Sequence, residues 1–186
     1  MKFIKAFFKH IFNRIWRLLR WIIFASVTGV ILGLVAAAFN FCLTEAVTLR
    51  ETNVGIAIFL PIVGLLIVYL YNKFSNAQDK GTNLVLSSIN SDEHIPLRMA
   101  PLIFISTVLT QMFGGSAGRE GAALQIGGSI GNYLGNWFKL DSKDKKVFIM
   151  SGMSAAFSAI FGTPVAAAIF SIEVREEKAR ERREDV

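Results

Sequence analysis

The sequence predicts an all-α, polytopic membrane protein with about five to seven tilted helices, some of them broken or re-entrant. Three observations support this fold class. Hydrophobic residues make up 53% of the chain. Residues 21–43 form a run of 23 without a charged side chain, long enough to cross a hydrocarbon core of about 30 Å. Glycine clusters and single prolines then interrupt the later apolar stretches, as in helices that break at membrane depth.

The N-terminal residues 1–20 are predicted to form a basic amphipathic helix at the membrane interface. Apolar side chains recur at helical spacing, and basic side chains fill the other face. No acidic residue precedes Glu45, so the net charge of +6 has a local origin and indicates an anionic membrane surface rather than a nucleic acid as partner. The positive-inside rule predicts a cytoplasmic N-terminus, for an integral protein of a bacterial inner or plasma membrane. The basic residues are Lys2, Lys5, Lys9, Arg14, Arg17 and Arg20.

The first half of the membrane domain is predicted to contain two spans. Residues 21–43 form the first, with a face of small residues for close helix contact. Residues 45–51 are expected to be a short polar break, and residues 54–71 a second span with a kink at Pro61. The small residues of the first span are Gly29, Gly33, Ala36, Ala37 and Ala38.

The second half of the domain is predicted to be a series of broken helices. Residues 100–114 lead into a Gly-rich turn, and residues 121–138 follow, crowded with small residues suited to tight packing. Residues 139–146 are expected to be a charged loop, and residues 147–174 a pair of half-helices separated at Gly162-Thr163-Pro164. The resulting division is an interfacial helix (1–20), a membrane domain (21–174) and a charged tail (175–186), which is a solvated helix or a frayed end.

An Arg119-Glu120 pair lies in the Gly-rich stretch 114–128, between two apolar segments. Charges at membrane depth are costly unless they have a partner or a water-filled path. The preceding glycines should end one helix and allow another to begin near Arg119, with unpaired N–H groups and the positive end of its dipole at that point. The pattern predicts an anion site, with Glu120 as a tethered carboxylate that competes with a mobile anion.

The motif Gly118-Arg119-Glu120-Gly121, followed by Gln125-Ile126-Gly127, resembles the signature of the chloride channel/transporter (CLC) family, with Ala122 where most members carry proline. The break at residues 162–164, followed by Phe170-Ser171-Ile172-Glu173, is a second similarity in the right order. The resemblance covers residues 20–174 and implies the first of two inverted repeats. It therefore also implies that another part, either a complementary half-chain or a second copy in a homo-oligomer, completes the ion pathway.

By this resemblance Glu120 is the gate, and Gly118, Arg119, Gly121 and Ala122 bind the anion. A second anion-facing helix start falls at Gly81, Thr82 and Asn83, whose Gly-x-Asn-Leu pattern is similar to the fluoride-handling branch; a solvated loop with a capped helix is the alternative. Val174 occupies the position where many exchangers of the family carry an inner glutamate, which favours a passive channel or a fluoride-type exchanger.

The expected function is transport of chloride-like anions through a pathway that a protonatable glutamate gates. The alternatives are a fluoride-type proton-coupled exchanger, a truncated fragment that does not conduct without a second half, and a non-transporting membrane interaction protein in which Arg119 and Glu120 pair for structure only. An enzyme is not expected, because neither His10 nor His94 lies in a span. No cofactor is expected, and the single Cys42 argues against disulfides and metal clusters.

Overall fold

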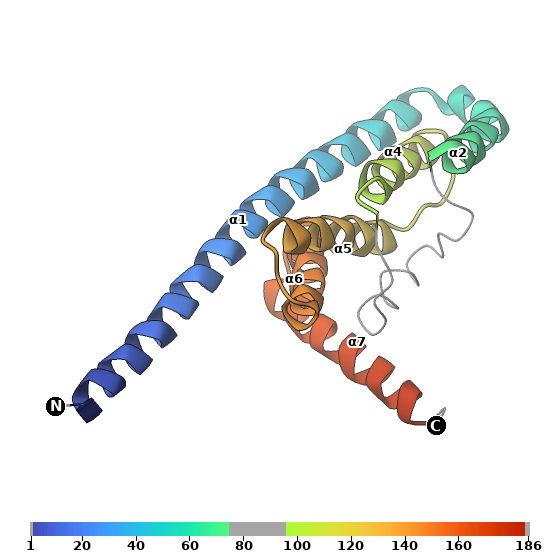
Figure 1. Ribbon diagram of the computed structural model, residues 1–186. Helices are drawn as coiled ribbons and strands as arrows, with labels where there is room; N and C mark the ends of the chain where they lie inside the picture. Colours follow the sequence, from blue (N-terminus) through green and yellow to red (C-terminus); the bar gives the residue numbers. More distant parts are fainter. Residues whose placement is uncertain (1, 75–95, 185–186) are drawn as a thin grey trace.

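The computed structural model describes residues 2–74 and 96–184, and the side chains of residues 14–16, 18–74, 96–173 and 176 among these. Within the described residues the chain forms six α-helices and one 3-10 helix, with no β-strand (Figure 1). The predicted all-α fold is confirmed.

Helix α1 (Lys2–Thr52) is a single uninterrupted element of 51 residues, about 77 Å long at 1.5 Å per residue. Neither glycine nor proline occurs before Gly29, so nothing separates the basic N-terminal segment from the first predicted span. One stripe of α1 is buried at helical spacing, which fixes the face that contacts the rest of the protein. It consists of Thr28, Leu32, Ala36, Phe39, Leu43 and Ala46. The placement of residues 1–20 in the membrane interface stays a prediction.

The polar break predicted at residues 45–51 is wrong, since α1 continues to Thr52. The hydroxyls of Thr44, Thr48 and Thr52 donate to carbonyls of the preceding turn over 2.9–3.1 Å, so the polar side chains are satisfied within the helix. The Asn53 side chain then donates to the Leu49 carbonyl at the helix end.

The predicted small-residue face of α1 is correct only in part. Ala36 is 3% exposed and packs in the core. A Cβ atom added at Gly29 or Gly33 would have no described atom within 4 Å, so these glycines do not mediate close helix contact within the described part of the chain.

The second predicted span consists of the 3-10 helix η1 (Val54–Phe59) and α2 (Leu60–Phe74). Pro61 lies in the first turn of α2, where its missing N–H costs least, rather than at a kink within a longer α-helix. By length and composition, residues Arg14–Thr52 and Val54–Phe74 are the two described segments able to cross a membrane.

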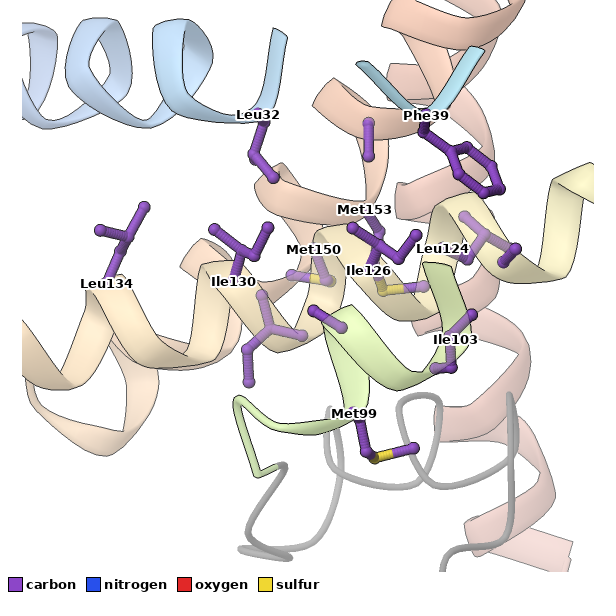
Figure 2. Close-up of a cluster of buried hydrophobic side chains, with 14 of the residues drawn as sticks. Leu32, Phe39, Met99, Ile103, Leu124, Ile126, Ile130, Leu134, Met150 and Met153 are labelled. Carbon is purple, nitrogen blue, oxygen red and sulfur yellow. The ribbon is translucent and has the colours of Figure 1, made fainter. Parts of the chain in front are cut away.

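Four further helices complete the described fold: α4 (Met99–Met112), α5 (Arg119–Trp137), α6 (Ser142–Phe161) and α7 (Pro164–Glu184). Helix α5 lies at the centre, with α1, α4 and α6 around it, and twelve of its 19 residues are buried. Figure 2 shows the apolar side chains that meet along α5. They include Leu32 and Phe39 of α1, Met99 and Ile103 of α4, Leu124, Ile126, Ile130 and Leu134 of α5, and Met150 and Met153 of α6.

The charged segment 139–146 is only partly a loop, because α6 already begins at Ser142. The Asp141 side chain accepts a hydrogen bond of 2.9 Å from the Asp144 backbone N–H and thereby caps the helix. The predicted break between α6 and α7 is confirmed. Gly162 ends α6 in the left-handed conformation (φ 68°), and Pro164 begins α7, which remains helical through the charged tail as far as Glu184.

Helices α5 and α6 make the closest contact in the described fold, through glycines on both sides. A Cβ atom at Gly127 would overlap the backbone carbonyl of Gly152 and would lie 2.7 Å from Ala156 Cβ. A Cβ atom at Gly131 would lie 2.8 Å from the carbonyl oxygen of Phe148. The small residues predicted for tight packing in residues 121–138 are confirmed in this role, because only hydrogen fits between the two backbones.

Candidate anion-binding site

The turn that connects α4 to α5 depends on two glycines. Gly114 adopts φ 89°, which disfavours any residue with a side chain. The N–H of Gly115 donates to the Thr110 carbonyl over 2.8 Å, and a Cβ atom at Gly115 would lie 2.6 Å from Thr110 Cγ2. The chain therefore leaves α4 sharply and approaches the start of α5 in an extended conformation.

Gln111 holds the second part of this turn in place. Its side-chain amide donates a hydrogen bond of 2.9 Å to the Ala117 carbonyl, immediately before the first residues of α5, and its side chain is 8% exposed. Gln111 is not among the site residues predicted from the sequence. A polar residue inside an apolar segment, one turn before a glycine pair, is the signal that could have suggested one.

Replacement of Gln111 by leucine is expected to destabilise the turn. The substitution removes the donor and leaves the Ala117 carbonyl without this partner, at a cost of about 1–3 kcal/mol. The thermal unfolding midpoint in detergent and the rate of proteolysis within residues 113–118 should both report the change. Asn136→Leu, at an exposed position near the end of α5, is the control and should leave proteolysis of the turn unchanged. Equal effects of the two substitutions would show that Gln111 does not support the turn.

Helix α5 begins at Arg119 without a side-chain cap. Its N-cap residue is Gly118, with an extended backbone (φ −71°, ψ 125°) and no side chain to accept from the first-turn amides. Glu120 lies in this first turn. The positive end of the helix dipole and unpaired N–H groups make such a terminus suitable for an anion or for the carboxylate of Glu120.

Arg119 and Glu120 are both exposed on this face of the chain. In the part of the chain that the structure describes, no ion pair joins them, and neither side chain forms a hydrogen bond. The alternative in which the two residues pair for structure alone therefore has no support in the described contacts. Among the described residues, neither charge is taken up by a partner.

The residues predicted to bind an anion on α5 are consecutive and lie at the start of the helix. Gly118 is the N-cap, Arg119 and Glu120 begin the first turn, Gly121 is half-buried, and Ala122 is 5% exposed against the core. The predicted second helix start, at Gly81, Thr82 and Asn83, lies outside the described residues. Its proximity to α5 stays a prediction.

The described fold and its glycine-initiated helix have counterparts in known proteins. A family model described as "Voltage gated chloride channel" matches residues 63–182, which include the turn, α5 and the break between α6 and α7. The chain belongs to this family. Members of the voltage-gated chloride channel family are integral membrane transporters or channels.

Two curated relatives in the voltage-gated chloride channel family illustrate the range of similarity. A "Chloride/fluoride channel protein" from Pseudomonas syringae pv. tomato is 37% identical over 156 residues, which cover 83% of this chain and 34% of the relative. An "H(+)/Cl(-) exchange transporter ClcA" from Citrobacter koseri is 28% identical over 166 residues, covering 80% of this chain and 35% of the relative. The chain thus spans about a third of the length of these relatives.

Two solved structures share the fold. A "CLC-type fluoride/proton antiporter" superposes with a TM-score of 0.75 at 40% identity, covering 81% of this chain and 38% of the other. A "slow cyanobacterial Cl-/H+ antiporter" superposes with a TM-score of 0.66 at 24% identity, covering 78% and 37%, and supports the fold alone. The prediction of a CLC-like fold is confirmed.

Proposed function

We propose that this chain provides one side of an anion pathway across a membrane, and that Glu120 gates it. The single observation that carries the proposal is the start of α5, where an uncapped helix N-terminus and a carboxylate occupy the same turn. The ionised Glu120 side chain occupies the electropositive spot at the helix start and excludes a mobile anion. Its protonation removes the competing charge and admits the anion.

Residues from one helix start cannot enclose an ion. Arg119 and Glu120 in the first turn of α5 are exposed on this chain, and transporters built from repeats place their sites where two repeats meet. We therefore include in the proposal a second body of protein opposite α5, either a complementary half-chain or a second copy of this chain. The proposal also includes Gly81, Thr82 and Asn83 as a further group of anion ligands, as the sequence resemblance implies.

Fluoride is the anion with the most direct support from relatives. The relative at 37% identity is named a chloride/fluoride channel protein, and the solved structure at 40% identity is a fluoride/proton antiporter. The Gly-x-Asn-Leu pattern at residues 81–84 agrees with that branch. We propose fluoride transport, with chloride as the competing assignment.

The test is a flux assay on the purified chain in liposomes loaded with fluoride or chloride, read with ion-selective electrodes between pH 5 and pH 8. Anion efflux should exceed that of protein-free liposomes, should be faster for fluoride, and should increase as the pH falls. Crosslinking in the same liposomes should trap a dimer of this chain. Absence of efflux from a preparation that crosslinks fully would contradict the transport proposal and favour a non-conducting membrane protein.

A further inference from the structure

A small polar hollow lies between the N-terminal part of α1 and the turn from α5 to α6, at the far end of α5 from Glu120. It has a volume of about 240 Å³. Helix α1 contributes one charged residue to its wall, and the turn and the start of α6 contribute three. The lining residues are Arg20, Trp21, Phe24, Lys139, Leu140, Asp141 and Asp144.

The position of Arg20 in the sequence sets the depth of this hollow in a membrane. Arg20 is the last charged residue before the uncharged run of residues 21–43, which is long enough to cross the hydrocarbon core. Trp21 follows it directly, and tryptophan is enriched at the level of the lipid headgroups. With residues 21–43 as the predicted span, the hollow would lie at the headgroup layer on the N-terminal side of the membrane.

Aromatic packing makes the floor of the hollow rigid. The Phe24 ring stacks on Phe138 with centroids 4.2 Å apart, and both rings meet Phe148 edge-on. The guanidinium carbon of Arg20 lies 5.1 Å from the centroid of the Phe24 ring, which holds that cation at the rim by a cation–π contact. These contacts hold the Arg20 guanidinium in a defined position beside the aromatic cluster of Phe24, Phe138 and Phe148.

The walls of the hollow carry two positive and two negative side chains. In the described part of the chain none of Arg20, Lys139, Asp141 and Asp144 forms an ion pair with another of the four. Asp141 uses one carboxylate oxygen to cap α6. Lys139 follows the end of α5 with a left-handed backbone (φ 53°), a conformation that glycine reaches at lower cost.

A pocket with two cations and two carboxylates matches a ligand that carries both charges. A purely anionic headgroup would be repelled by Asp141 and Asp144. A bare cation would be repelled by Arg20 and Lys139. We propose that the hollow binds the headgroup of a phosphoethanolamine phospholipid. Arg20 and Lys139 bind its phosphate, Asp144 and the free oxygen of Asp141 accept hydrogen bonds from its ammonium group, and Trp21 packs against the glycerol region.

Native mass spectrometry of the purified chain tests the lipid preference of the wild-type protein without any substitution. Phosphatidylethanolamine should bind about tenfold more tightly than phosphatidylcholine, whose methylated ammonium cannot donate the charge-assisted hydrogen bonds. It should also bind more tightly than phosphatidylglycerol. Equal binding of phosphatidylethanolamine and phosphatidylcholine, or a preference for phosphatidylglycerol, would overturn the assignment. Displacement of the lipid by millimolar inorganic phosphate would identify a free-phosphate site and would also overturn it.

Substitutions separate the two ends of the headgroup. Arg20→Gln should weaken the binding of all three phospholipids by about tenfold, because each carries a phosphate. Asp144→Asn should remove only the preference for phosphatidylethanolamine over phosphatidylcholine. Lys143→Gln, on the first turn of α6 but outside the hollow, and Glu51→Gln, near the other end of α1, are the controls and should bind as the wild type does. Retention of the preference in Asp144→Asn would contradict the proposal.

Discussion

Liposomes that contain the Glu120→Gln variant are expected to carry anions at a rate that does not change with pH. Glutamine keeps the size of the side chain but has no charge to place at the start of α5, so the helix terminus stays open to a mobile anion at every pH. Wild-type flux, in contrast, should rise as the pH falls, because protonation of the gate removes the competing negative charge. Efflux measured from pH 5 to pH 8 gives both profiles.

The control for this experiment is Glu173→Gln. Glu173 is exposed on α7 and lies well within that helix, so it has no helix N-terminus to compete for. This variant should keep the wild-type pH profile. If Glu120→Gln also keeps that profile, the gate is another group and the assignment of Glu120 is wrong.

Gly152→Ala is expected to cause a large loss of stability, comparable to that of a methyl addition at Gly127. The added Cβ would overlap the Gly127 carbonyl oxygen and would lie 3.1 Å from Gly131 Cα. These are backbone atoms, which cannot rotate away, so α5 and α6 must separate along a contact that holds much of the core. Overpacking of this kind costs about 1–3 kcal/mol, and here the upper end is expected. Size-exclusion thermostability in detergent provides the measurement.

Gly33→Ala is the matched control for Gly152→Ala. Gly33 is also helical, but a Cβ atom there would meet no described atom within 4 Å. Alanine should instead stabilise α1 by up to about 1 kcal/mol through its higher helix propensity. Opposite signs for the two substitutions would confirm the packing role of Gly152, and similar losses at both positions would refute it.

Local signals explain which elements could be predicted from the sequence. The start of α5 at Arg119 and the break before Pro164 were found because glycine and proline act on the backbone within a few residues. The break predicted at residues 45–51 is wrong because polar residues alone do not distinguish a loop from an exposed helical turn. In the structure, threonine hydroxyls bond to the helix itself, and α1 continues.

Nonlocal packing explains what could not be predicted. Gly33 and Gly152 both occur in stretches rich in small residues, yet only Gly152 meets a neighbouring helix. Which face of a helix is covered depends on where its partner lies, and the sequence of one helix does not contain that information. The candidate site likewise has a local part and a nonlocal part. Gly118–Ala122 are consecutive residues, so the sequence alone predicts that they lie together. The hydrogen bond from Gln111 to Ala117 depends on the path of the turn, which the sequence does not show.

The interlocked backbones of α5 and α6 would limit the conformational changes available to the anion transport that we propose. Sliding or rotation of α5 would drive Gly131 into the carbonyl of Phe148, so the two helices must travel as one unit. Conformational change near the ion therefore belongs to the short connection at residues 113–118, or to rotamer changes of the acid itself. Kinetic variants with altered turnover but intact folding should accordingly cluster in that connection rather than along the helix pair.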